Sequence, residues 1–375
     1  MFINYLSKSL NAILFSLIVT FILMGCENDS FEHPNYMAFN NVEYVTEFPE
    51  TFSLQNKSIP NIDIIGMRNF AIYDSILILN TTKPNGLWSF YSLLNYQKYG
   101  DHLKRGEGPL EFMQGPSASS NSKITNEGDQ LVAFLYDFQK GRLLKLNITK
   151  SIETNNQQLS ILNDDLPPFL FNFTFIDSSR YLIKKIENSN RQQIRSFIKD
   201  GHESEISILK KLNQASIVQG EDYNILSTIT KYNNINNVFL EMPIGLNYLN
   251  IYSLDSTIAK TICIGEKLYD IEEIQKQSPE ERIYTFANSR IYDDFLGVVF
   301  INEGKKNYQT NRTKLPSILL FDWNGHPLAE LKLENHITSF DIDFINQELY
   351  TFDVHSDEFF KYDIKDILTT LKLAN

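Results

Sequence analysis

Cysteine is almost absent from this chain. Its 375 residues include only two, Cys26 and Cys263, and Cys263 lies inside the apolar run 261–264. We expect Cys263 to be a buried structural thiol, because a single cysteine in the mature domain has no intramolecular partner. The fold must therefore be stabilised by burial of apolar surface rather than by disulfides.

Clustered positive charge is missing as well. The formal net charge is -12, and no dense run of lysine or arginine occurs anywhere in the sequence. A nucleic-acid-binding surface needs clustered cations that displace counterions from phosphates. The composition therefore predicts no nucleic-acid partner.

Patterns that mark catalytic or metal sites are also absent from the sequence. The six histidines are scattered, without an HExxH or other metal-ligand spacing. No GxSxG motif occurs, and the serines of GPSAS (115–119) lack an assigned histidine and aspartate. The sequence therefore assigns no catalytic, cofactor-binding or metal-binding residue.

Two weaker patterns leave alternatives open. Asp341 and Asp343 lie on one face of a predicted strand, so their oxygens could bind calcium or simply form a polar strand face. Trp88 and Trp323 could stack on sugars, but each lies in a strand pattern that favours packing in the core.

The N-terminus contains the one long apolar run. Residues 12–24 are almost entirely apolar, and such a run is too short to span a bilayer and is typical of a secretory signal peptide. The junction LMGC (23–26) resembles the bacterial lipobox, in which the leader is removed and the cysteine is diacylated. We therefore predict a signal peptide at 1–25, a lipid on Cys26 and a lipidated tether at 26–41.

The predicted tether is polar and acidic. Glu27, Asp29 and Glu32 follow Cys26, a pattern that resembles the export signal of surface lipoproteins in Bacteroidota, although the same charges would also suit a plain solvated tether. Either way, a lipid anchor predicts a membrane partner. The expected location is the cell envelope, at the periplasmic or surface face of the outer membrane.

The rest of the chain repeats one pattern. An apolar or aromatic strand, a turn of Asn, Asp or Gly, and a second strand recur with their turns about 54 residues apart. Six such units are found, at residues 87–100, 141–153, 194–209, 249–265, 317–333 and 359–373. A further strand pair precedes each unit, so that every repeat has four strands.

Six four-stranded repeats predict an all-β fold, a six-bladed β-propeller over residues 42–375. The alternating segment 42–48 lies outside the repeats, and we expect it to pair with the last blade and close the ring. Two insertions lengthen the later repeats. The first, 268–286, predicts a short helix starting at Ser278-Pro279, and the second, 303–316, predicts an exposed loop.

The stretch RGEGPLEF (105–112) raises the question of a phosphate-binding loop. It lacks the Gly-Lys-Ser/Thr ending of a Walker loop and the third glycine of a dinucleotide-binding loop. Its position between the first two repeats predicts instead a crossover between blades, in which Phe112 enters the groove between them. The crossover motif comprises Gly106, Glu107, Gly108, Pro109, Glu111 and Phe112.

This motif, with Tyr99-Gly100 before it, resembles the Gly-x-Gly-Pro-Gly-Glu-Phe signature of the TolB-like six-bladed β-propeller lipoproteins of Bacteroidota. The resemblance extends over the mature chain through the lipobox, the motif and the six repeats. Leu110 stands where the family has its third glycine. The family implies a membrane-anchored propeller and no established chemistry.

A propeller gathers its loops at two ends of a rigid disc, an arrangement that suits binding. The sequence therefore predicts a membrane-anchored, non-enzymatic binding or scaffold module for an envelope protein, peptide or glycan. The alternative is a calcium-dependent hydrolase or lactonase, by analogy with propellers of the lactonase type. A purely structural envelope component is a third possibility.

Overall fold

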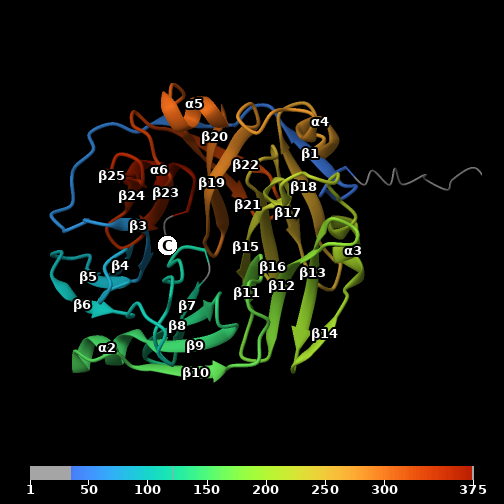
Figure 1. Ribbon diagram of the computed structural model, residues 1–375. Helices are drawn as coiled ribbons and strands as arrows, with labels where there is room; N and C mark the ends of the chain where they lie inside the picture. Colours follow the sequence, from blue (N-terminus) through green and yellow to red (C-terminus); the bar gives the residue numbers. More distant parts are fainter. Residues whose placement is uncertain (1–34, 121, 374–375) are drawn as a thin grey trace, which may run out of the picture. The chain divides into compact units, whose positions relative to one another are not determined.

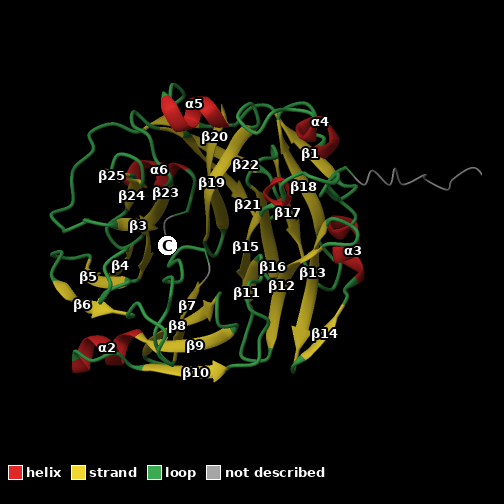
Figure 2. Ribbon diagram, viewed as in Figure 1, coloured by secondary structure: helices red, strands yellow, loops and turns green. Residues whose placement is uncertain are grey.

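Six sheets form the part of the chain that the computed structural model describes, residues 35–120 and 122–373. They are the blades of a six-bladed β-propeller and follow one another around a common centre in chain order (Figure 1). The helices are short and lie between or outside the strands (Figure 2), and none within the described ranges is long and apolar enough to cross a membrane. The predicted signal peptide and Cys26 lie outside these residues.

The first three blades each contain four antiparallel strands, with the innermost strand first in sequence. Blade 1 consists of β3 (Met67–Tyr73), β4 (Ile76–Thr81), β5 (Trp88–Ser92) and β6 (Lys98–His102). Blade 2 consists of β7 (Ser122–Glu127), β8 (Gln130–Asp137), β9 (Arg142–Asn147) and β10 (Leu159–Asn163). Blade 3 consists of β11 (Asn172–Phe175), β12 (Arg180–Glu187), β13 (Gln192–Lys199) and β14 (His202–Ser204).

The last three blades differ in strand number: the N-terminal segment adds one strand to each of blades 4 and 5, and blade 6 has three strands. Blade 4 consists of β15 (Thr228–Asn233), β16 (Val238–Pro243), β17 (Tyr248–Tyr252), β18 (Ala259–Ile264) and β1 (Val42–Val45). Blade 5 consists of β19 (Ile283–Ile291), β20 (Phe295–Gly304), β21 (Ser317–Asp322), β22 (Pro327–Lys332) and β2 (Thr51–Ser53). Blade 6 has three strands, β23 (Ser339–Asp343), β24 (Glu348–Asp353) and β25 (Glu358–Asp363).

The N-terminal segment runs along the outer edges of the last three blades, and this corrects one prediction. The segment 42–48 was expected to pair with the last blade, but its strand β1 pairs in parallel with β18 of blade 4. Strand β2 then pairs in parallel with β22 of blade 5, and Ser58 forms a single bridge with Lys361 of blade 6. The strand pattern itself is compatible with any of these edges, so the sequence could not select the partner.

Apolar clusters fill the spaces between neighbouring blades and close the ring. The cluster between blades 6 and 1 includes Phe70, Leu77 and Leu79 of blade 1 together with Tyr350 and Phe359 of blade 6. Five further clusters join blades 1 to 2, 2 to 3, 3 to 4, 4 to 5 and 5 to 6. Closure therefore depends on side-chain packing between the first and last blades, because no strand of one blade is shared with the other.

The helices correct four further expectations. The short helices are α2 (Ile148–Thr154), α3 (Ser207–Asn213), the 3₁₀ helix η1 (Tyr223–Leu226), α4 (Ile271–Gln275), α5 (Lys305–Thr310) and α6 (Lys365–Thr370). Helices α2 and α6 each replace the turn and the second strand that the units 141–153 and 359–373 predicted. Helix α4 precedes the expected start at Ser278, and α5 lies in the segment expected to be an open loop.

Local capping explains why two of these segments are helical. The Asn147 side chain accepts a hydrogen bond from the backbone N–H of Lys150 and so caps α2, and the Asp270 side chain caps α4 through Glu272. Near Ser278, by contrast, the Glu281 carboxylate accepts hydrogen bonds from the Ser278 backbone and hydroxyl and closes only a turn. Asparagine is common both in turns and at helix N-caps, so the sequence alone did not distinguish the two at Asn147.

Candidate functional site

The crossover motif connects β6 of blade 1 to β7 of blade 2 and is held by two basic side chains of blade 2. The Lys140 ammonium donates to the carbonyl oxygens of Gly108 and Glu111, at 2.8 and 2.9 Å. Arg142 donates to the carbonyl of Pro109 at 2.6 Å and forms an ion pair with Asp137. These contacts anchor the connection to blade 2.

Inside the motif, the chain folds tightly on itself. The backbone N–H of Gly108 donates to the Glu111 carboxylate at 2.9 Å, and a Cβ on Gly106 would lie 2.0 Å from the same carboxylate. The side chain of Phe112 is fully buried in the cluster between blades 1 and 2. The remaining motif residues, Glu107 and Pro109, complete the turn.

The other residues singled out by the sequence lie in the core. Trp88 and Trp323 are buried in the clusters between blades, and their indole N–H groups donate to the carbonyls of Pro116 and Tyr292. They are not available for stacking on sugars. Cys263 is also buried, and burial raises the pKa of its thiol to about 11.

A cavity of about 570 Å³ lies on the axis of the propeller. Its walls come from the innermost strand of every blade, β3, β7, β11, β15, β19 and β23, and from the loops that follow several of them. The innermost strands border the axis, and the side chains with which they line the cavity include polar and charged ones such as Lys231 and Arg290. Other side chains of the same strands, such as Phe70 and Phe340, pack between blades. All six blades therefore meet at this cavity.

One side of the cavity holds a complete ion pair. The Arg290 guanidinium lies 3.2 Å from the Asp341 carboxylate and also donates to the backbone carbonyls of Phe340 and Phe70. Asp341 further accepts hydrogen bonds from the backbone N–H of Ile72 at 2.7 Å and from the Tyr292 hydroxyl at 3.1 Å. These contacts join the inner strands of blades 1, 5 and 6.

The pairing of Asp341 bears on the calcium alternative. Both carboxylate oxygens of Asp341 accept hydrogen bonds from protein groups. The second aspartate of β23, Asp343, accepts hydrogen bonds from the turn residues Ile345 and Asn346. Calcium requires six to eight oxygen ligands. Within the described ranges no three His, Cys, Asp or Glu side chains come close enough to share an ion, and the nearby cations oppose one. Asp341 and Asp343 are therefore committed to contacts within the protein.

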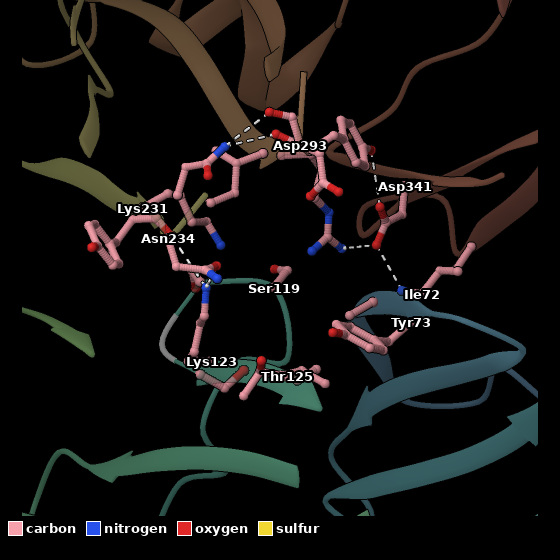
Figure 3. A pocket seen from close by; sticks show the side chains of 18 of the residues that line it. Ile72, Tyr73, Ser119, Lys123, Thr125, Lys231, Asn234, Asp293 and Asp341 are labelled. Carbon is pink, nitrogen blue, oxygen red and sulfur yellow. Dashed lines mark hydrogen bonds and ion pairs between the residues drawn. The ribbon is translucent and has the colours of Figure 1, made fainter. Parts of the chain in front are cut away.

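The opposite side of the cavity carries two lysines, which Figure 3 shows together with Asn234. The Lys123 ammonium of β7 donates to the Asn234 side chain at 3.2 Å and to the Tyr232 carbonyl at 3.4 Å. The Lys231 ammonium of β15 has no hydrogen bond or ion pair with any described residue. Lys231 is therefore a cation in a cavity whose three donors are free.

Burial changes the ionisation of both lysines. Burial lowers the pKa of Lys231 to about 7, the positive charges of Arg290 and Lys123 act in the same direction, and Asp341 opposes them. Burial also lowers the pKa of Lys123. Such shifts gather at functional sites, although structural ion pairs produce them too. An anion in the cavity would favour the charged form of Lys231.

The mouth of the cavity is exposed and carries apolar side chains beside three exposed carboxylates. Ile235, in the turn after β15, is 61% exposed, and Ile345, in the turn after β23, is 68% exposed. Phe344 stands beside Ile345 and packs edge-on against Tyr292. The mouth therefore offers apolar surface above a polar and cationic interior.

Sequence reasoning named Asp341 but missed the two lysines and Arg290. The signal that could have found them is a charged residue in the first strand of a repeat, because that strand faces the axis. Lys123, Lys231, Arg290 and Asp341 all meet this description. What no local pattern reveals is which of them are paired.

Comparison with known proteins places the whole architecture in one family. The sequence model described as "TolB-like 6-blade propeller-like" matches residues 67–344. The chain belongs to this family. The match spans the first strand of blade 1 to the turn after the first strand of blade 6. A search of curated proteins gives no match to this TolB-like propeller.

Solved structures show a general likeness. A DUF4221-family protein of Bacteroides vulgatus has 12% identity and a TM-score of 0.47, with 85% of this chain and 96% of that chain covered. A luciferin-regenerating enzyme has 10% identity and a TM-score of 0.41, with 84% and 92% covered. Chaetomium thermophilum Raptor has 10% identity and a TM-score of 0.40, with 84% of this chain but only 28% of Raptor covered.

Proposed function

We propose that this TolB-like propeller is a non-enzymatic binding module whose ligand site is the axial cavity. The observation that carries the proposal is the Lys231 ammonium, which lines the cavity without a partner among the described residues. An enclosed ammonium without a partner is costly to keep charged, so that either its pKa falls or an anion compensates its charge. A bound ligand would supply that interaction.

The size of the cavity supports a small ligand. A volume of about 570 Å³ lies within the range of small-molecule pockets and is too small for a folded partner. An envelope protein, peptide or glycan of the kind expected from the sequence would enter it by a terminal group only. The six-blade wall makes the site rigid, so that little ordering of the protein opposes binding.

A thermal-shift screen of the full-length chain tests the proposal. Small molecules that bind the folded state should raise the melting temperature in proportion to their occupancy. The Asn234→Trp variant places a large side chain at the exposed edge of the cavity, and Glu153→Trp places the same side chain on the exposed surface of α2. We expect hits for the wild type and Glu153→Trp that are lost in Asn234→Trp.

Two results would contradict this proposal. One is a set of hits that Asn234→Trp binds as well as the wild type, which would place the ligand elsewhere. The other is an absence of hits combined with a structure of the cavity closed by its own side chains. A lower melting temperature of unliganded Asn234→Trp would not matter, because the readout is the shift caused by the ligand.

We further propose that the module is fastened to a membrane through a lipid on Cys26, which lies outside the described residues. The apolar leader and the LMGC junction support this. In a bacterial host, labelled fatty acid should enter the wild type and the Cys263→Ala variant but not Cys26→Ser, and only Cys26→Ser should leave the membrane fraction. Labelled Cys26→Ser would refute the anchor.

A further inference from the structure

The interior of the axial cavity has a directional distribution of charge. Its cations are set back from solvent: Arg290 is buried, and Lys123 and Lys231 are only partly exposed. The carboxylates that line it without an ion-pair partner, Asp74, Asp293 and Asp294, are on exposed turns. Exposed charges are screened by water and salt, whereas enclosed charges are not. The enclosed part of the cavity is therefore electropositive.

Donors are in excess in this part of the cavity. Lys231 has three free N–H groups, and Lys123 uses two of its three on Tyr232 and Asn234. Among the described residues that line the cavity, Asp341 is the one enclosed carboxylate, and it is already bound by Arg290, Tyr292 and Ile72. A ligand group placed beside Lys231 must therefore accept hydrogen bonds and carry negative charge to be held well.

Apolar surface lies on the path between the lysines and solvent. Ile235 is in the same turn region as Asn234, and Ile345 and Phe344 stand across the cavity on blade 6. Deeper in the wall, Phe134 and Phe175 stack with ring centroids 4.0 Å apart. Apolar side chains with a few directed polar groups are the usual make-up of a small-molecule pocket.

From this arrangement we infer that the cavity binds a small amphiphilic oxyanion, an organic molecule with a carboxylate or phosphate group on an apolar body. Its anionic group lies against Lys231 and Lys123, and its apolar part lies toward Ile235, Phe344 and Ile345. This inference rests on the proposed function and specifies its ligand class. A neutral sugar could accept hydrogen bonds from the ammonium but would leave its charge uncompensated, and a cation would be repelled by it.

The test uses a pair of matched probes and the full-length chain, purified in a non-ionic detergent. The probes are 4-phenylbutyrate and its neutral counterpart 4-phenylbutyramide, which share the apolar body and differ in the terminal group, an anionic carboxylate or an uncharged amide. Calorimetric titration into the wild type should show the carboxylate binding about tenfold or more tighter than the amide, since a charge-assisted hydrogen bond is worth about 1.5–3 kcal/mol. Phenyl phosphate, measured in parallel, distinguishes a carboxylate site from a phosphate site.

Three variants assign the effect to Lys231. Lys231→Met removes the charge at similar length and should abolish the preference for the anionic probes, and Lys231→Arg should keep it. Lys199→Met removes an exposed lysine at the end of β13 that has no partner among the described residues, and should match the wild type. Circular dichroism of each variant confirms that it is folded.

The outcomes separate the inference from the proposed function. Equal affinity for the amide and the anions, with binding lost in Asn234→Trp, would overturn the ligand class and leave the cavity as a binding site. Anion preference that persists in Lys231→Met would overturn the role of Lys231. Failure of both probes to bind the wild type, together with no hit in the thermal-shift screen, would overturn both proposals.

Discussion

Two lysines on neighbouring blades show how the same residue type can take a structural or a binding position. Burial lowers the pKa of Lys184 on β12 and of Lys231 on β15 to about 7 in each case. Lys184 lies between blades 3 and 4, where its ammonium is 3.9 Å from the Glu241 carboxylate and donates to the Thr228 hydroxyl. Lys231 lines the axial cavity and has no partner among the described residues.

The network around Lys184 is complete. Glu241 accepts two hydrogen bonds from Arg195 Nε, at 2.9 and 3.0 Å, and one from the Tyr252 hydroxyl at 3.2 Å. Burial alone would raise the pKa of Glu241, but Arg195 and Lys184 lower it to about 2. Partners for every charge indicate a structural role, whereas a missing partner beside a cavity indicates room for a ligand.

The largest expected effect comes from breaking the paired network. Glu241→Gln leaves Arg195 and Lys184 buried without their counter-ion, which should lower the free energy of unfolding by about 3–5 kcal/mol. Urea denaturation monitored by fluorescence measures it. Glu127→Gln, which removes one partner of the surface pair with Lys145, is the matched control and should change stability by less than about 1 kcal/mol. Similar effects for both variants would show that the buried network is not structural.

The unpaired lysine should respond in the opposite direction. Lys231→Met removes a desolvated charge that Asp341 offsets only in part and that no described group pairs with directly, so it should raise the free energy of unfolding at pH 7 by about 1–2 kcal/mol. The folded-state pKa of about 7 lies below the ordinary value of 10.5, so the unfolded chain binds more protons between these values. Wild-type stability therefore rises with pH in this window.

The check is the pH dependence of the difference in free energy of unfolding between the wild type and Lys231→Met. Arg290, Asp341 and Lys123 face Lys231 from β19, β23 and β7, and Asp74, Asp293 and Asp294 also line the cavity. These groups are common to the wild type and Lys231→Met, so the difference between the two isolates Lys231. The advantage of Lys231→Met should shrink between pH 7 and 10. A less stable Lys231→Met at pH 7 would mean that the ammonium has a structural partner.

A third buried group sharpens the comparison, because it lacks partners yet lies outside the cavity. Both ring nitrogens of His102 are buried without a hydrogen-bond partner among the described residues, and the ring stacks on Phe90 at 4.6 Å. Burial lowers the pKa of His102 below its ordinary 6.5, although Asp101 opposes this. Near and below pH 6.5 the unfolded chain therefore binds more protons at this position than the folded chain, so the free energy of unfolding decreases as the pH decreases.

His102→Leu should remove the decrease in the free energy of unfolding that His102 causes at low pH. As the pH falls from 7 to 5, the free energy of unfolding of the variant should rise relative to that of the wild type by about 1 kcal/mol. Urea midpoints at several pH values measure it, and His202→Leu, at an exposed histidine of β14, serves as control. Parallel pH profiles for the wild type and His102→Leu would show that His102 is not held neutral.

Much of the fold could be predicted from the sequence because its signals are local. Alternating apolar residues and turns of Asp, Asn or Ser predict the first two strands of each blade. The turn at Asp177 is an example, because its carboxylate accepts hydrogen bonds from the backbone N–H groups of Ser179 and Arg180. The all-β six-bladed propeller and its four-strand pattern are confirmed. The crossover between blades 1 and 2 likewise lies between β6 and β7.

The features that could not be predicted depend on contacts between distant segments. Strand β1 could match several blade edges, and the choice of β18 rests on the ion pair of Glu43 with Lys260 and on packing of Val45 between blades 4 and 5. The cavity likewise gathers residues more than two hundred positions apart, such as Ile72 and Asp341. A charge in an inner strand can be predicted, but its pairing requires the closed ring.

The most direct test of the central claim, that the axial cavity holds a free ammonium for an anionic ligand, is an NMR titration of Lys231. In the full-length chain with ¹³C-labelled lysine, assigned through Lys231→Arg, the Lys231 side chain should titrate with a pKa of about 7. Saturating 4-phenylbutyrate should raise that pKa by about one unit, because the anion stabilises the charged form. A Lys231 pKa near 10.5 that 4-phenylbutyrate does not change would contradict the account.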